Sequence, residues 1–286
     1  MESKICICGA GTMGRGIALT IAKAGIQVIL YDLQPGILAE ASGQIEMELD
    51  QDLHKKIISG TEKENIRKRI VFTSSITDCQ ADLIIEAIIE KPEAKAELFL
   101  QLSALNPEST LFATNTSSLS VSTIAERCPR PEKIIGLHFF NPATKMKLVE
   151  IIRTKYNSDE ILKRVLEFST QIKKTAVVCQ DAPGFIVNHV ARPFYLEALR
   201  LSEMEISDEA TIDRLMESAG FKMGPFHLMD LIGNDINYTV SSSLYEALGK
   251  PSRLKPSVIQ EAMVKNGKLG KKTGRGFFQY NKPLAK

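Results

Sequence analysis

Short apolar runs and stretches with helical spacing follow one another along the first two thirds of the chain. The apolar runs have the length and β-branched character of buried strands. They cover residues 4–8, 26–31, 70–73, 83–87, 110–114, 134–140, 148–152 and 176–179. Helical stretches such as 92–102, and one that begins with Ser158 as a possible N-cap, separate several of them. This alternation predicts an α/β fold with a mostly parallel sheet covered on both faces.

The pattern changes after the turn-rich segment 181–184 (DAPG). Beyond it the periodicity is almost entirely helical, over 185–202, 208–219, 225–248 and 256–266. The sequence therefore predicts two domains, an α/β domain over 1–182 and an all-helical domain over 183–286.

A glycine-rich turn joins the first predicted strand to the first helix. Gly9, Gly11 and Gly14 form a GxGxxG pattern, and Asp32 closes the second strand. Strand, glycine turn, helix, strand and acid together are typical of a dinucleotide-binding site, in which the helix N-terminus binds the pyrophosphate. Asp32 favours NAD, because a carboxylate accepts hydrogen bonds from ribose hydroxyls and repels the 2′-phosphate of NADP.

Composition narrows the class of protein further. Of 286 residues, 36 are Lys or Arg and 34 are Asp or Glu, so the net charge of +2 gives no argument for nucleic-acid binding. No apolar run is long enough for a membrane span, and none precedes the first strand as a signal peptide would. The five cysteines form no CxxC pair, so we expect neither disulfides nor a metal site, and a cytoplasmic location. Cys6 and Cys8 are expected to act as small buried hydrophobes.

One histidine lies inside an apolar strand. His138 needs a hydrogen-bond partner there, and Glu150 occupies the next apolar strand with the same need. If the strands are neighbours, the carboxylate would fix the tautomer of the ring and make it a general base. The pair could equally serve only to fix the strand register.

Two polar residues lie where ligands bind in such folds. Ser117 follows the strand 110–114, at whose carboxyl end a substrate would bind, although Ser is also common in turns and N-caps. Asn188 lies on the first helix of the second domain and can both donate and accept. The highly charged helical segment 36–69 is either a pair of solvated helices or an arm over the substrate, with Lys55 and Lys56 placed to bind phosphates.

Taken together, these motifs resemble those of the 3-hydroxyacyl-CoA dehydrogenases, most closely the short bacterial 3-hydroxybutyryl-CoA dehydrogenases. The resemblance extends from Lys4 to about Tyr280. It rests on segments 9–14 (GAGTMG), 82–87 (DLIIEA), 115–119 (NTSSL), 137–142 (LHFFNP), 146–150 (MKLVE), 181–188 (DAPGFIVN), 223–226 (MGPF) and 270–278 (GKKTGRGFF).

The resemblance implies a Rossmann-type NAD-binding domain and a helical C-terminal domain that also forms a homodimer. It implies interconversion of a (3S)-3-hydroxyacyl-CoA, short-chain as in 3-hydroxybutyryl-CoA, and the 3-oxoacyl-CoA. His138 would be the general base, Glu150 would orient it, and Ser117 and Asn188 would bind the substrate oxygen. The helical arm would contact the CoA. Further cofactor contacts are implied for Thr12, Met13, Glu90, Lys95, Asn115, Ser117, Asn141 and Lys272.

The chain departs from this family at Thr144 and Lys145, where a Pro-Val pair is common, and at Glu48 in the arm, where a small hydroxyl residue is common. Lys145 is either a solvent-facing lysine or a partner for the carboxylate of a dicarboxylic acyl-CoA, such as 3-hydroxyadipyl-CoA. Two other functions compete. The dehydrogenases of free β-hydroxy acids use a lysine in the interdomain helix, where this chain has Asn188 and His189. An NAD-binding structural or sensor protein would tolerate loss of the His–Glu pair.

Overall fold

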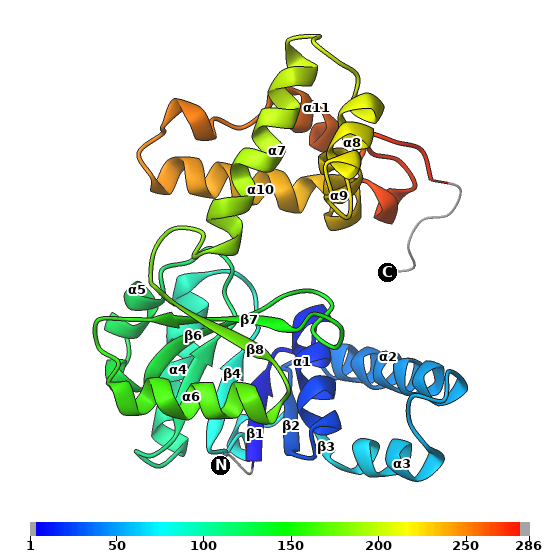
Figure 1. The fold of residues 1–286 in the computed structure, drawn as a ribbon. Helices are drawn as coiled ribbons and strands as arrows, with labels where there is room; N and C mark the ends of the chain where they lie inside the picture. The colour runs from blue at the N-terminus through cyan, green and yellow to red at the C-terminus, as the bar shows by residue number, and fades with distance from the viewer. Residues whose placement is uncertain (1–3, 281–286) are drawn as a thin grey trace. The chain divides into compact units, whose positions relative to one another are not determined.

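The structure, a computed structural model, describes residues 4–280. The chain divides into two compact units, Met1–Ala182 and Pro183–Lys286. Figure 1 shows strands in the first unit and a helical second unit that begins with α7. No helix in the described part of the chain has the length and apolar character that crossing a membrane requires.

The N-terminal unit is built on one eight-stranded sheet with the order β3-β2-β1-β4-β5-β6-β7-β8. Every neighbouring pair is parallel except β6 and β7, which are antiparallel. Each apolar run predicted as a strand is a strand, with its ends shifted by at most one residue. The bounds are β1 Lys4–Cys8, β2 Gln27–Tyr31, β3 Ile70–Thr73, β4 Leu83–Glu86, β5 Leu111–Thr114, β6 Ile134–Phe139, β7 Leu148–Arg153 and β8 Thr175–Gln180.

Helices cover both faces of this sheet, as the near-continuous apolar character of its central strands predicts. On one face Ile5 and Ile7 of β1 join a core cluster with α1 (Thr12–Lys23) and α6 (Asp159–Gln171). On the other, Phe99 of α4 (Pro92–Leu105) packs edge-on against Phe112 of β5, with ring centroids 5.6 Å apart. Ser158 caps α6 through the amide of Ile161, as predicted. The sequence did not predict the short helix α5 (Val121–Glu126) or the 3-10 turns η1 (Ile76–Asp78) and η2 (Pro131–Lys133).

The charged segment 36–69 forms two helices, α2 (Pro35–His54) and α3 (Gly60–Lys68), beside α1 (Figure 1). They are not solvated on all sides, because Ile45, Leu49 and Ile66 belong to the same core cluster as α1. Lys23 of α1 pairs with Asp52 at 2.6 Å and Glu48 at 3.6 Å. Glu48, the residue at which this chain differs from the family pattern, therefore helps to hold α2 against α1 of the sheet domain.

The C-terminal unit contains α7 (Val187–Glu203), α8 (Glu209–Ser218), α9 (Pro225–Ile232), α10 (Asn234–Ala247), η3 (Ser252–Leu254), α11 (Val258–Lys265) and η4 (Lys271–Thr273). The predicted single helix over 225–248 was wrong: it is α9 and α10, divided at Gly233. Gly233 has a φ of +106°, which a helix cannot contain and which glycine adopts without strain.

Two buried carboxylates organise this unit. Asp213 accepts hydrogen bonds from the amides of Phe226 and His227 at the start of α9. Asp230 accepts from the amides of Phe277 and Phe278 and so ties the C-terminal segment to α9. A Cβ on Gly276 would lie 1.9 Å from the Asp230 carboxylate, so the GRGFF segment needs glycine there.

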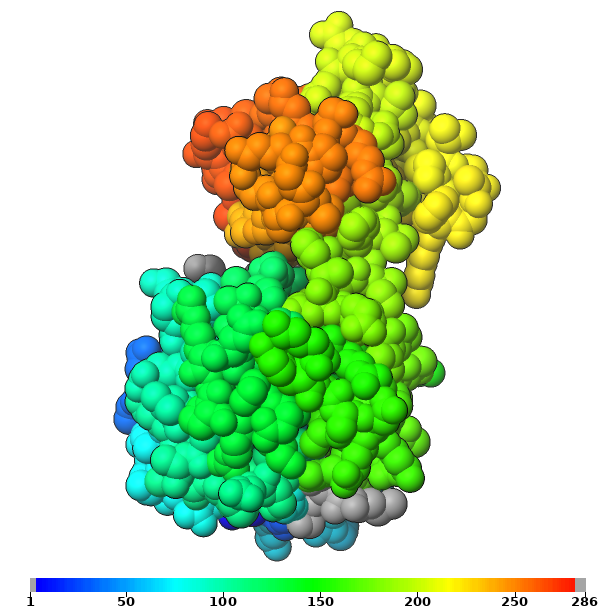
Figure 2. Space-filling model, turned by 90° about the vertical axis from the view of Figure 1, so that its left-hand side faces the viewer, coloured from blue at the N-terminus to red at the C-terminus, as the bar shows by residue number. Residues whose placement is uncertain are grey.

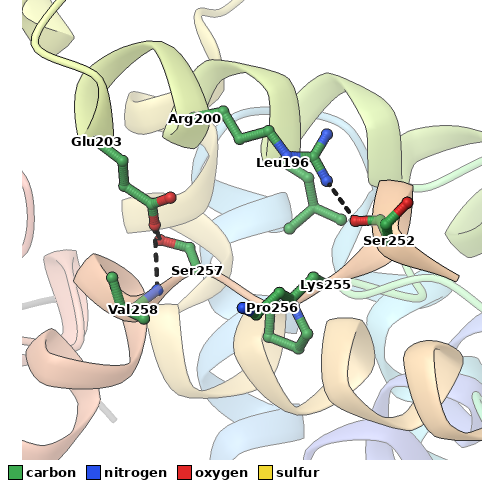
Figure 3. Close-up of a pocket in the computed structure, with 8 residues that line it drawn as sticks. All are labelled: Leu196, Arg200, Glu203, Ser252, Lys255, Pro256, Ser257 and Val258. Atoms are coloured by element: carbon green, nitrogen blue, oxygen red, sulfur yellow. Dashed lines mark hydrogen bonds between the residues drawn. The ribbon is translucent and has the colours of Figure 1, made fainter. Parts of the chain in front are cut away.

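A surface pocket lies between α7 and the segment 252–258 of this unit (Figure 3). The same segment, orange in the space-filling view, lies on the surface in Figure 2. Arg200 donates to the carbonyl of Ser252, and Glu203 accepts from the amide of Val258 at 3.1 Å. These two charged groups therefore bind backbone and join η3 and α11 to α7. No residue predicted for the active site lines this pocket.

Candidate active site

The glycine turn between β1 and α1 leaves no room for side chains at two of its three glycines. Gly9 has a φ of +101°, and a Cβ there would lie 2.6 Å from the carbonyl oxygen of Ala87. A Cβ on Gly14 would lie 1.7 Å from the carbonyl oxygen of Gly9. These contacts explain the tight turn and the close packing of α1 that the pattern predicts.

Gly11 differs, because a Cβ built there meets nothing within 4 Å. It is the N-cap of α1, and no side chain caps the helix or places an acid in its first turn. The first amides of α1 and the positive end of its dipole therefore meet open space above Gly11. This arrangement fits the pyrophosphate of a dinucleotide, which would bind against the backbone at Gly11, Thr12 and Met13.

Asp32 follows β2 and is fixed by backbone amides. Its Oδ2 accepts from Ala10 at 2.9 Å and its Oδ1 from Gln34 at 3.0 Å. The side chain thus bridges the glycine turn and the segment after β2. Each carboxylate oxygen can accept more than one hydrogen bond, so Asp32 can still bind ribose hydroxyls.

A buried ion pair, Lys95–Glu86, lies at the carboxyl end of β4, with the more exposed Glu90 as a third member. Lys95 of α4 is only 1% exposed and binds Glu86 at 2.6 Å and Glu90 at 3.1 Å. Burial raises the pKa of Glu86, and the ammonium group of Lys95 and the hydroxyl of Thr114 oppose that rise. The sequence did not assign Glu86 a role. The sequence contains one indication of such a role: Glu86 is an acid inside the apolar segment 82–87, just as Glu150 is an acid inside an apolar strand.

Glu90 organises the turn after β5. Its Oε1 accepts from the hydroxyl of Thr116 at 2.5 Å and from the amide of Ser117 at 3.1 Å. Burial pushes the pKa of Glu90 up, but Lys95 and Thr116 outweigh it and hold the pKa below its ordinary value. Asn115, in the same turn, accepts from the amide of Phe139 at 2.8 Å and so joins the turn to β6. Ser117 is therefore held at the carboxyl edge of the sheet, next to the strand that carries His138.

The two strands that carry His138 and Glu150 are neighbours. In the antiparallel register of β6 and β7 these two residues are direct partners. The His138 Nδ1 lies 2.8 Å from the Glu150 Oε2, and both side chains are buried. Because the carboxylate accepts the Nδ1 proton, the neutral ring carries its lone pair on Nε2. The ring also packs on Phe140, with centroids 4.6 Å apart.

The loop between β6 and β7 begins with a cis peptide bond between Asn141 and Pro142. Asn141 is exposed, two residues beyond the end of β6. Lys145 is also exposed, and its amide donates to the carbonyl of Pro142 at 3.0 Å.

The remaining candidate residues lie on other elements. Lys55 and Lys56 are exposed in the connection between α2 and α3. In the C-terminal unit, Asn188 is the second residue of α7 and its carbonyl accepts from the Arg192 Nε at 3.1 Å. Lys272 pairs with both carboxylate oxygens of Asp235 within that unit, at 2.5 and 2.7 Å.

Comparison with known proteins gives two adjoining family matches. Residues 4–182 match the model of the "3-hydroxyacyl-CoA dehydrogenase, NAD binding domain", and residues 184–280 match that of the "3-hydroxyacyl-CoA dehydrogenase, C-terminal domain".

Individual relatives cover almost the whole chain. A 3-hydroxyadipyl-CoA dehydrogenase of Escherichia coli is 41% identical over 96% of this chain. The match spans only 58% of that relative's length. A probable 3-hydroxybutyryl-CoA dehydrogenase of Bacillus subtilis is 38% identical over 98% of both proteins. The crystal structure of an (S)-3-hydroxybutyryl-CoA dehydrogenase from Ralstonia eutropha superposes with a TM-score of 0.94 at 32% identity, covering 99% of this chain and 100% of that one.

Proposed function

Because the chain belongs to the 3-hydroxyacyl-CoA dehydrogenase family, we propose that it interconverts 3-hydroxyacyl-CoA and 3-oxoacyl-CoA thioesters with NAD as cofactor. The observation that carries this proposal is the buried His138–Glu150 pair, held at 2.8 Å by direct partners on neighbouring strands. A pair that only fixed the register of the two strands would not need a titratable ring, whereas a dehydrogenase needs a base that takes the proton of the substrate hydroxyl.

The N-terminal unit supplies the cofactor site. The backbone at Gly9, Gly11 and Gly14 and the uncapped start of α1 would hold the pyrophosphate, and Asp32 would bind the adenosine ribose. When bound, NAD accepts the hydride from the substrate carbon that carries the hydroxyl. Glu90, fixed by Lys95, would position the Asn115–Ser117 turn beside the nicotinamide side of the cofactor.

His138 moves the proton in this scheme. In oxidation its Nε2 takes the proton of the 3-hydroxyl group, and in reduction the protonated ring returns it. Glu150 accepts from Nδ1 throughout, so it orients the ring and stabilises the imidazolium. Ser117 and Asn188 would hydrogen-bond the substrate oxygen, and Asn141 would lie near the ring.

The remaining contacts concern the CoA and a second subunit. Lys55 and Lys56, exposed in the arm, would bind CoA phosphates, and Lys272 would approach the cofactor if it leaves Asp235. The C-terminal unit exposes Val190, Leu215 and other large apolar side chains that a second copy of the chain would cover. A homodimer would therefore use this unit.

The test follows the loss of NADH absorbance with acetoacetyl-CoA, comparing the wild type with His138→Gln. We expect turnover to fall by about 10²–10⁴-fold, the usual contribution of a general base, with NADH affinity unchanged. Turnover that survives the change would show that another group is the base. A wild type that binds NADH but turns over no 3-oxoacyl-CoA would favour an NAD-binding structural or sensor protein.

A dicarboxylic acyl-CoA is a second candidate for the substrate, beside a short-chain acyl-CoA. The exposed cation of Lys145 lies six residues after the end of β6, and the Escherichia coli relative is named for 3-hydroxyadipyl-CoA. The Lys145→Val variant should lose preference for the adipyl-type substrate over the butyryl one, through KM rather than kcat. An unchanged preference would leave Lys145 as a solvent-facing residue.

A further inference from the structure

Three cysteine thiols converge inside the N-terminal unit, and the proposed mechanism uses none of them. Cys6 and Cys8 lie on β1, and Cys79 follows the turn η1. The Sγ atoms of Cys6 and Cys8 are 3.9 Å apart, and all three Sγ atoms lie within 4.8 Å of one another. All three side chains are fully buried.

The strand alternation and one asparagine set this arrangement. Ile5 and Ile7 point to the α1 face of the sheet, so Cys6 and Cys8 share the opposite face. The buried side chain of Asn106 donates to the Cys79 carbonyl at 2.9 Å and accepts from the Ala81 amide at 3.1 Å. These two bonds fix the backbone after Cys79, and the Cys79 amide, which donates to the carbonyl of Ile76 at 3.0 Å, fixes it on the other side.

The spacing of the thiols fits a central atom bonded to sulfur alone. A planar centre bound at about 2.3 Å from each of three sulfurs, the Zn–S length, spaces them by about 4.0 Å, and a pyramidal centre spaces them by about 3.5 Å. Three thiols that lie within 4.8 Å of one another therefore need to draw together by only about 1 Å to bind such a centre. Within the described residues, no histidine or carboxylate joins the cluster as a fourth ligand. Sulfur-only ligands select soft, thiophilic elements, and three ligands select an element that is satisfied by three bonds.

Charge decides which soft element fits. Three thiolates around a monovalent ion carry two net negative charges, and around a divalent ion they carry one. Around a trivalent centre they carry none. Because all three side chains are fully buried, any net charge would lose its hydration without compensation. A trivalent thiophile is therefore favoured, and it can arrive as an uncharged hydroxide.

We propose that Cys6, Cys8 and Cys79 form a binding site for trivalent arsenic or a trivalent element of the same class. Arsenous acid, As(OH)₃, condenses with the three thiols. Three S–H and three As–O bonds break, three As–S bonds form, and three waters leave. Arsenic stays trivalent throughout, so the step needs no oxidant or reductant.

The experiment adds one equivalent of arsenite to the reduced full-length protein, both folded and during refolding, and measures the native mass. Three As–S bonds add one arsenic and remove three hydrogens, whereas binding by two thiols keeps a hydroxyl and is one water heavier. We expect the three-bond mass in at least one preparation, together with a higher unfolding temperature. No mass gain in either preparation would show that the thiols are only small buried hydrophobes.

Matched variants locate the site. Cys79→Ala should lose the three-bond mass, and Cys128→Ala, which removes a buried thiol outside the cluster, should keep it. NADH binding and thermal unfolding of both variants report whether the fold is intact. Retention of the three-bond mass by a folded Cys79→Ala variant would overturn the proposal. Zn²⁺ binding tighter than arsenite would overturn the charge argument.

Discussion

Removal of the Lys95 ammonium group should destabilise the N-terminal unit strongly. In Lys95→Met the apolar stem remains, but Glu86 and Glu90 lose their shared cation. At the observed 2.6 Å and an effective dielectric constant of about 20, the attraction between Lys95 and Glu86 is about 6 kcal/mol. Part of this offsets the cost of desolvation, so breaking the buried pair should lower the free energy of unfolding by about 3–5 kcal/mol. Glu90 adds little, because its side chain is 39% exposed.

The loss should depend on pH with a definite sign. Burial already raises the pKa of Glu86, and removal of Lys95 takes away the largest opposing influence. A carboxylate whose folded pKa lies above its unfolded value of about 4.3 loses stability as the pH rises from the unfolded toward the folded pKa. The deficit of Lys95→Met should therefore be largest near neutral pH and shrink as the solution is acidified toward the unfolded value.

Urea unfolding followed by circular dichroism measures both effects. The double variant Lys95→Met with Glu86→Gln removes both buried charges and should recover more than half of the loss, because the amide can still bind Thr114 and Ile88. A loss below about 1 kcal/mol would refute the reasoning, since that is the value of an exposed pair. A double variant no more stable than the single one would refute it as well.

Three further predictions concern the active site. Gly14→Ala should destabilise the protein by about 3 kcal/mol or more in denaturation, because its Cβ would lie 1.7 Å from the Gly9 carbonyl oxygen. Gly11→Ala should change stability by no more than about 1 kcal/mol but weaken NADH binding in a fluorescence titration, and equal effects of the two variants in both measurements would contradict this prediction. Glu150→Gln should lower kcat about 100-fold or more without changing NADH affinity, and a change in affinity alone would contradict a role through His138. Asp32→Ser should weaken NADH binding and improve the relative use of NADPH, and an unchanged ratio of the two would place the ribose elsewhere.

The sequence predicted the features that a single strand or turn determines. The strands of the sheet, the glycine turn and the change to helices after residue 182 follow from local periodicity and glycine placement. The adjacency of His138 and Glu150 was also predictable, because two buried polar groups in successive apolar strands need each other.

Features that join distant segments were not predictable in the same way. The family resemblance placed Lys95 at the cofactor, but lysine is rarely buried, so nothing in its helical segment predicts that it pairs with Glu86 in the interior. Cys79 meets Cys6 and Cys8 only through the path of the η1 turn. The division at Gly233 was missed because apolar spacing continues across it, and only the backbone angle shows the end of α9.

Because His138 and Glu150 are direct partners in the sheet, the geometry of this pair can stay constant while the sequence of the nearby loop changes. Backbone hydrogen bonds of β6 and β7 hold the pair in register, and Phe140 packs on the His138 ring. Beyond Phe140 and Asn141, the connecting segment 143–147, which contains Lys145, can therefore vary in sequence while the His–Glu pair stays in place. If Lys145 binds the end of the acyl chain as proposed, substitutions in this segment would change the preferred acyl group while His138 still moves the proton, so a library confined to these residues is a direct starting point for directed evolution.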